Sequence, residues 1–201
     1  CSLIWDDQTQ QAAVIDPGGD LDLILSEVQQ RGLKLEQIWL THAHIDHAGG
    51  TGQWAREWDL PIIGPHEGDQ FWIDGLPQQS QMFNFAPAEM FTPTRWLADG
   101  DTVELGAHTI QVRHCPGHTP GHTALWVSLP ESGSVLLSGD LYHRAESREL
   151  ARVPRFNSDE AETRASMVAF ERLATELGAR FIIQHEELDV ALLPELPGFL
   201  N

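Results

Sequence analysis

A dense group of side chains able to bind metal lies near residue 45. Residues 41–47 read Thr-His-Ala-His-Ile-Asp-His, so three histidines and one aspartate fall within one short segment. Imidazole nitrogens and carboxylate oxygens are the donors that a borderline divalent ion such as zinc accepts. The small neighbouring residues let the backbone fold these side chains around one point, and Gly49 and Gly50 permit a tight turn after them. This density predicts a metal site.

Further candidate ligands follow predicted strands. Four short apolar runs, rich in β-branched residues, are typical of buried strands: residues 38–40, 110–112, 135–137 and 181–183. Each run is followed by a side chain that could bind a metal, in chain order His42, His118, Asp140 and His185. A strand is a rigid element, and ligands of open sheets gather at strand ends. We therefore expect these side chains to converge.

The elements that must position these residues are helices and strands in alternation. Apolar positions predict a helix from Asp20, as its cap, to Gly32, a second over residues 51–58, and a long third one capped by Asn157 or Ser158. A hairpin is expected around Gly106. Residues 66–93 show no sustained period and are predicted to be an irregular loop. Together these patterns favour an α/β protein with mixed sheets covered by helices.

The motif at residues 42–47 resembles the His-x-His-x-Asp-His motif of the metallo-β-lactamase superfamily. Other matching segments follow in order and extend the resemblance over nearly the whole chain: residues 14–19, 116–122, 138–140 and 184–185. The resemblance implies an αββα sandwich, with two mixed β-sheets flanked by helices. We expect one domain over residues 1–201, and leave open whether a first strand precedes residue 1.

The resemblance also implies a ligand set for two divalent ions. The first ion is expected on His42, His44 and His118. The second is expected on Asp46, His47 and His185. Asp140 bridges the two, and Asp46 also orients the attacking hydroxide. Zinc is favoured over iron or manganese. Two divalent ions close together would lower the pKa of a shared water and polarise a substrate carbonyl. The chain is therefore expected to be a metal-dependent hydrolase.

The remaining histidines, Asp16 and Cys115 are expected to have structural roles rather than to bind metal. His122 and Asp16 are expected to support the ligands or the turns rather than to bind metal. Surface or hydrogen-bonded positions are favoured for four other histidines, which are His66, His108, His114 and His143. Cys115 lies in an apolar stretch and is expected to be a buried small hydrophobe.

The two parts of the chain resemble two branches of the superfamily that act on different substrates. Residues 1–123 look like short glyoxalase II-like proteins, which hydrolyse thioesters of glutathione, whereas residues 125–201 are closer to the acyl-homoserine lactonase branch. A natural mosaic and an engineered chimera would both give this pattern. Thioester hydrolysis is favoured over lactone hydrolysis. Tyr142, the one tyrosine of the chain, is a candidate catalytic residue that helps hold a lactone carbonyl, with a packed core position as the alternative.

Two other classes of protein share part of this pattern. Sulfur dioxygenases of the same superfamily carry the motif but use one iron to activate oxygen, so metal identity discriminates them. A non-catalytic zinc domain is disfavoured, because structural zinc sites close with about four ligands, usually including cysteine. Seven candidate ligands without a cysteine indicate open coordination.

The composition of the chain limits the classes of partner that it is expected to bind. With 30 acidic and 12 basic residues, the formal net charge of −18 disfavours binding to nucleic acid. No apolar run is long enough to span a membrane. Two cysteines are too few for a disulfide framework, so a cytoplasmic location is expected. The expected partner is a small-molecule thioester or lactone.

Overall fold

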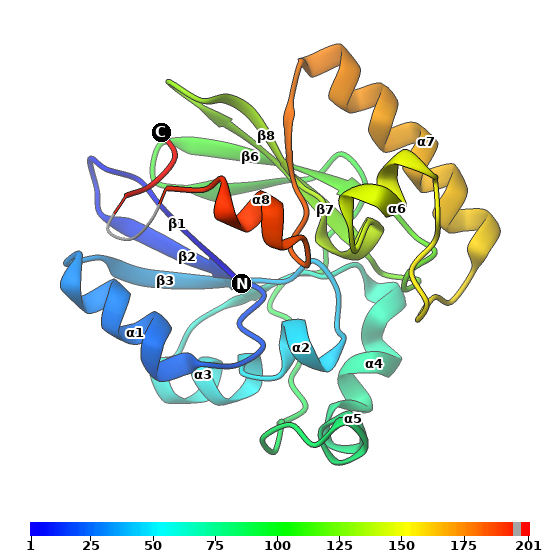
Figure 1. Ribbon diagram of the computed structural model, residues 1–201. Coiled ribbons are helices and arrows are strands. Elements are labelled where there is room, and N and C mark those ends of the chain that lie inside the picture. Colours follow the sequence, from blue (N-terminus) through cyan, green and yellow to red (C-terminus); the bar gives the residue numbers. More distant parts are fainter. Residues whose placement is uncertain (195–197) are drawn as a thin grey trace. The chain divides into compact units, whose positions relative to one another are not determined.

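Helices and strands alternate along the chain in the computed structural model, which describes residues 1–194 and 198–201 (Figure 1). The chain divides into two compact units, each described here by itself. Unit 1 consists of Cys1–Leu97 and Val103–Thr109, and unit 2 of Ala98–Thr102 and Ile110–Asn201. The single domain expected from the sequence stays a prediction.

Unit 1 contains a mixed sheet of four strands. Their spatial order follows the chain: β1 (Ser2–Trp5), β2 (Gln11–Ile15), β3 (Lys34–Trp39) and β4 (Ile62–Ile63). The first pair is antiparallel, while β2–β3 and β3–β4 are parallel. The parallel pairs need crossovers, which contain α1 (Leu21–Gln30) and α3 (Thr51–Trp58). Both helices pack on the sheet, where Trp54 and Leu21 join a core with Val14 and Ile38.

The predicted irregular loop at residues 66–93 is largely helical, so that expectation was wrong. It contains η1 (Glu67–Asp69), α4 (Gln70–Asp74) and α5 (Leu76–Phe83). Each helix is only a few turns long or less, and Gly75 separates the last two, so no window of 11 to 18 residues carries one helical period. Ile73 and Leu76 are fully buried and pack in one cluster with Ala43 and Ile45. This segment therefore supports the loop after β3.

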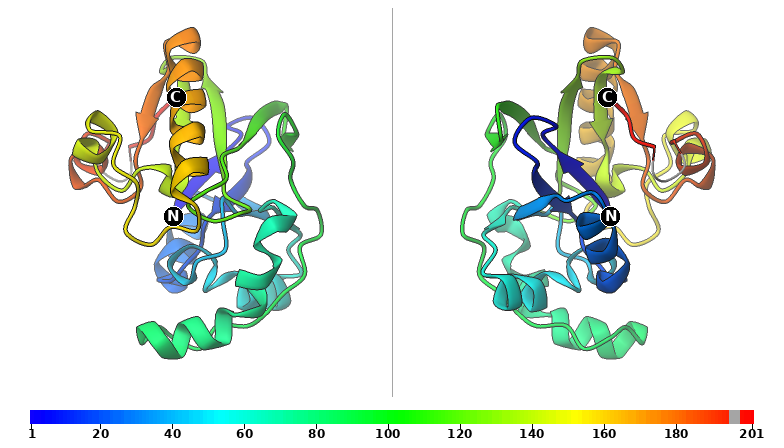
Figure 2. Two further views of the ribbon diagram at one scale, coloured as in Figure 1. Left: turned by 90° about the vertical axis from the view of Figure 1, so that its right-hand side faces the viewer. Right: turned by 90° about the vertical axis from the view of Figure 1, so that its left-hand side faces the viewer.

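Unit 2 contains a second mixed sheet. The order of the sheet is β5 (Thr102–Leu105), β6 (His108–His114), β7 (Thr123–Leu129), β8 (Gly133–Leu137) and β9 (Arg180–Ile182). Most of β6 and all of β7, β8 and β9 lie in this unit. The β6–β7 and β7–β8 pairs are antiparallel, and β8–β9 is parallel. The crossover to β9 contains α7 (Glu160–Leu177), which lies along the strands in both views of Figure 2. Met167 and Phe170 of α7 pack against Leu136 and Phe181.

Short elements complete the fold. They are α2 (Ile45–Ala48), β5 (Thr102–Leu105), η2 (Gly139–Leu141), α6 (Ala145–Glu149) and α8 (Glu187–Ala191). Strands β5 and β6 flank Gly106 as expected, and its positive φ of 58° suits the turn between them. The predicted mixed sheets with covering helices are confirmed. Among the described helices, none is both long and apolar enough to cross a membrane.

Of the two predicted helix caps, Asp20 holds the expected position without a side-chain bond, and the cap predicted for α7 was wrong. Asp20 precedes α1 in a left-handed conformation, with φ 52°, and makes no side-chain cap hydrogen bond. Helix α7 is capped by Asp159, whose carboxylate accepts from the N–H of Glu162 at 2.9 Å. The expected caps have other partners, because Asn157 accepts from the hydroxyl of Thr163 and the hydroxyl of Ser158 donates to a carbonyl.

Candidate metal centre

The loop after β3 gathers the four candidate ligands of unit 1. His42 and His44 lie in the loop, and Asp46 and His47 lie on the short helix α2. The ring centroid of His42 is 4.9 Å from that of His44 and 4.1 Å from that of His47. Nε2 of His47 is 3.7 Å from the Asp46 carboxylate. The motif therefore brings its donors together locally, as the sequence predicts.

A buried carboxylate orients two of these histidines. Asp16 is fully buried and accepts from the backbone N–H of Thr41 at 2.8 Å and from its hydroxyl at 2.7 Å. The Thr41 oxygen then accepts from Nδ1 of His42 at 3.0 Å, and Nδ1 of His47 donates to Asp16, also at 3.0 Å. A carboxylate only accepts, so these bonds place both ring protons on Nδ1 and both lone pairs on Nε2. The expectation that Asp16 supports the ligands is confirmed.

The ionised form of Asp16 is stabilised by these donors. Complete burial opposes ionisation, but the hydrogen bonds from His47 and Thr41 outweigh it and hold the pKa of Asp16 below its ordinary value. The charge of Asp16 thus persists in the protein interior, where it fixes ring orientation as carboxylates do behind metal-binding histidines.

Close backbone packing shapes the same loop. A Cβ atom on Gly18 would collide with the carbonyl of Asp46. The N–H of Gly50 also donates to the carbonyl of Pro17 at 2.9 Å. Only glycine permits the approach at residue 18, which explains why a Pro-Gly-Gly segment follows β2.

Two residues of the segment predicted to be irregular hold the backbone of the ligand loop. Asp69 is fully buried and accepts from the N–H of Ala43 at 2.9 Å. Gln79 on α5 accepts from the N–H of Ile45 at 3.0 Å and donates to the carbonyl of Trp72 at 2.9 Å. Sequence reasoning missed both residues, because no local motif marks a hydrogen bond between residues 26 or more positions apart.

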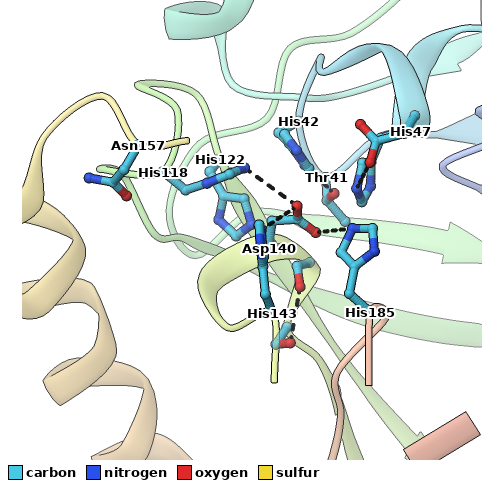
Figure 3. Close-up of polar contacts among 12 residues, drawn as sticks. Thr41, His42, His47, His118, His122, Asp140, His143, Asn157 and His185 are labelled. Carbon is cyan, nitrogen blue, oxygen red and sulfur yellow. Dashed lines mark hydrogen bonds and ion pairs between the residues drawn. The ribbon is translucent and has the colours of Figure 1, made fainter. Parts of the chain in front are cut away.

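In unit 2, Asp140 is the centre of the candidate site. Its Oδ2 is 3.5 Å from Nε2 of His118, and its Oδ1 is 3.3 Å from Nε2 of His185 (Figure 3). His118 and His185 therefore face different oxygens of the Asp140 carboxylate. His118 and Asp140 are buried, whereas the His185 side chain is 40% exposed.

The sheet explains this convergence. Asp140 follows β8 and His185 follows β9, and these strands are adjacent and parallel, so their carboxyl ends meet at one edge. His118 lies in the turn after β6, where Gly117 has a φ of 126° and touches the backbone of Thr163. A Cβ at residue 117 would collide with that backbone, so the turn requires glycine.

His122 supports Asp140 without being placed as a ligand. Its Nε2 accepts from the backbone N–H of Asp140 at 2.9 Å. Its Nδ1 must then carry the proton, and it donates to the carbonyl of Cys115 at 3.2 Å. Both ring nitrogens are thus occupied within the protein, and the supporting role expected for His122 is confirmed.

His143 is hydrogen-bonded, which is one of the positions expected for it, and its partner belongs to the candidate site. Its Nε2 lies 2.9 Å from Oδ2 of Asp140, and its ring centroid is 5.5 Å from that of His118 and 5.2 Å from that of His185. The Asp-x-x-His spacing of Asp140 and His143 was the sequence signal, since η2 turns the chain and brings residues three apart together.

Tyr142 is packed in the core of unit 2. Its side chain is fully buried, and its hydroxyl donates to the Glu171 carboxylate at 3.0 Å. Burial and the charge of Glu171 raise the pKa of the phenol far above its ordinary value. Of the two interpretations of Tyr142, this contact favours the packed position.

The positions predicted for three other histidines and for Cys115 were confirmed. Nδ1 of His66 accepts from the N–H of Gly68, His108 lies beside Asp6 with 53% of its side chain exposed, and His114 contacts the carbonyl of Pro120. Cys115 is buried, and burial raises the pKa of its thiol to about 12, so it is a poor nucleophile.

Comparison with known proteins places this geometry in a family. Residues 1–183 match the metallo-beta-lactamase superfamily. A relative named hydroxyacylglutathione hydrolase GloC, from Haemophilus influenzae, is 36% identical over 142 residues, which make up 70% of this chain and 65% of that protein. The matched segment thus spans slightly less than two thirds of the relative's own length.

Solved structures agree in fold. TTHA1623 in a di-iron-bound form is 29% identical with a TM-score of 0.71, and the match covers 90% of this chain and 84% of that one. A quorum-quenching N-acyl homoserine lactone lactonase gives a TM-score of 0.73 at 20% identity, covering 98% and 83% of the two chains. The second likeness concerns the fold alone. The predicted metallo-β-lactamase fold is confirmed.

Proposed function

Since the chain belongs to the metallo-beta-lactamase superfamily, we propose that it is a hydrolase that holds two divalent ions and cleaves a carbonyl substrate. The ligands proposed for the first ion are His42, His44 and His118. Those proposed for the second are Asp46, His47 and His185. Asp140 is proposed to bind both.

The observation that carries this proposal is the pairing at Asp140. Two donors bound to one ion at about 2.0–2.2 Å in a tetrahedron lie about 3.4 Å apart. The separations from Asp140 to His118 and His185 are 3.5 and 3.3 Å, each from a different oxygen. A carboxylate whose two oxygens lie at this separation from two different histidines has the arrangement expected of a bridge between two ions.

The donors of each unit fit a borderline divalent metal. All are imidazole nitrogens or carboxylate oxygens, which suit zinc and also iron or manganese. When bound, such ions would lower the pKa of a water and polarise the carbonyl under attack. Zinc as the metal and the cytoplasm as the location remain predictions.

The side chains of unit 1 would contribute orientation. Asp16 and Thr41 hold the rings of His42 and His47 so that Nε2 of each ring can bind a metal ion. Asp46 has 41% of its side chain exposed, so its carboxylate can accept a hydrogen bond from an attacking water. Such a bond would fix the direction of the water's lone pair toward the carbonyl carbon.

The substrate class we favour is a glutathione-type thioester. The relative at 36% identity carries the name hydroxyacylglutathione hydrolase, whereas the lactonase structure described above is 20% identical. Lactone opening is the second candidate, favoured by the resemblance of residues 125–201 to the acyl-homoserine lactonase branch. A mononuclear iron dioxygenase is the third, and it predicts a different metal content.

Elemental analysis together with turnover would separate these candidates. The purified protein should contain nearly two divalent ions per chain and hydrolyse a glutathione thioester faster than an acyl-homoserine lactone. Lactone turnover alone would move the assignment to the second candidate. One iron per chain with neither hydrolysis would contradict the hydrolase.

The bridging role of Asp140 can be tested by substitution. Asp140→Ala should lower activity by at least about 100-fold, more than the usual effect of removing a residue behind a ligand, because both ions lose a donor. Metal content should fall in the same variant. Asp22→Ala, which changes an exposed carboxylate on α1, is the matched control. Full turnover by Asp140→Ala would refute the proposed two-ion centre.

A further inference from the structure

The histidine beside Asp140 has a role that the seven proposed ligands do not include. We propose that His143 is a positioning residue, which donates a hydrogen bond to Oδ2 of Asp140 and thereby holds that carboxylate in its metal-binding orientation. This inference rests on the metal centre proposed above and adds one residue of unit 2 to it.

The separation between the two groups distinguishes a hydrogen bond from shared metal coordination. Nε2 of His143 is 2.9 Å from Oδ2 of Asp140, the usual length of an N–H···O hydrogen bond. His118 and His185 are 3.5 and 3.3 Å from the same carboxylate, near the separation of about 3.4 Å expected for donors that share one ion. His143 is thus closer to Asp140 than a second ligand of the same tetrahedral ion would be.

The chemistry of the acceptor assigns the proton. An ionised carboxylate offers only lone pairs, so the hydrogen in this contact must lie on Nε2 of His143. A ring nitrogen that carries a proton has no lone pair to give to a metal. The same oxygen of Asp140 keeps further acceptor capacity for a metal, because each carboxylate oxygen has two lone pairs.

Packing on both sides of His143 fixes its backbone. On one side, Tyr142 is buried and donates to Glu171, and Arg148 donates two hydrogen bonds to the same carboxylate at 2.7 and 2.9 Å. The Arg148 guanidinium also lies 3.7 Å from the ring centroid of Phe181. These contacts hold Glu171 ionised, with its pKa below the ordinary value because of Arg148.

On the other side, the chain is tied to the segment after β9. The N–H of Ala145 donates to the carboxylate of Glu186 at 2.7 Å, and Glu186 follows His185 directly. His143 therefore lies between two anchored residues, and 31% of its side chain is exposed. A residue held in this way can keep one orientation without being deeply buried.

The test measures metal affinity in the full-length chain, with Zn²⁺ and Co²⁺ as probes in competition with a chromophoric chelator. His143→Ala should weaken binding of the more tightly held ion by about 10- to 100-fold, as removal of groups behind metal ligands does. His143→Gln should bind within about threefold of the wild type, because its amide N–H can replace the imidazole donor. His108→Ala, at a partly exposed histidine of unit 1, should bind as the wild type does.

Two results would overturn the proposal. One is wild-type metal affinity in His143→Ala. The other is equal loss in His143→Ala and His143→Gln with a shift of the Co²⁺ d–d bands toward fewer nitrogen ligands, which would make His143 a ligand. A wild-type protein that binds neither ion would instead refute the proposed function, so the two failures are distinguishable.

Discussion

Single buried carboxylates organise much of this molecule through hydrogen bonds. Asp16 accepts from Thr41 and His47, Asp69 from Ala43, and Asp6 from three backbone N–H groups. Bonds from a donor to an ionised acceptor are stronger than neutral ones and lock the acceptor's neighbours in place. In a chain with 30 acidic residues, these few are structural because they are buried and fully engaged.

Asp6 gives a prediction about acid stability. Backbone donation, first from Ala107 and then from Thr9 and Gln8, lowers the pKa of Asp6 from 3.8 to about 2. A depressed pKa means that its contribution to stability is complete above the unfolded value and is lost as pH falls. The free energy of unfolding should therefore decline between about pH 4 and pH 2, and Asp6→Asn should flatten part of that decline.

The measurement is urea unfolding of metal-free protein at several pH values in this window. Asp7→Asn, at an exposed neighbouring position, serves as the control and should keep the wild-type slope. Identical slopes for the wild type and Asp6→Asn would show that the turn contacts of Asp6 do not survive in solution.

At the scale of elements, the short helices α4 and α5 act as a support for the ligand loop. Their apolar residues pack beneath the loop, and Asp69 and Gln79 engage two of its backbone N–H groups. Helices this short are not stable alone, so they form because they bury Ile73 and Leu76. Support and loop are therefore expected to be ordered together.

Gln79→Ala tests this support. The change leaves the buried N–H of Ile45 without its acceptor, which should cost about 1–3 kcal/mol of unfolding free energy and weaken metal binding. Gln78→Ala is the matched control, because Gln78 is the exposed neighbour on the same helix. Chemical unfolding and chelator competition measure the two effects. Equal stability and equal metal affinity of the two variants would show that α5 does not support the ligand loop.

At the scale of the whole molecule, bound metal should contribute to stability. A ligand that binds only the folded state adds about 2.7 kcal/mol when its free concentration is 100 times Kd. The unfolding midpoint should therefore rise with Zn²⁺ concentration and fall on chelation. Asp140→Ala should show a smaller rise, which thermal unfolding at matched metal concentrations would measure. A midpoint independent of metal in the wild type would contradict a tight site.

The sequence by itself predicted the family, most of the elements outside residues 66–93 and the candidate ligands. Residues 42–47 form a local motif, and the ligands after β8 and β9 follow apolar strands, so both signals lie within a few residues of the side chain concerned. The helix over residues 51–58 was predicted with its observed bounds, because its pattern is local too.

Only the tertiary structure showed the supporting residues that lie far along the chain from the residues they contact. Gln79 meets Ile45 from 34 positions away, and Glu171 meets Tyr142 from 29 positions away. The contact of His143 with Asp140 depends on the turn of η2, which brings the ring to that carboxylate. Hydrogen bonds between distant segments depend on how helices pack on a sheet, and spacing along the chain carries no record of that packing.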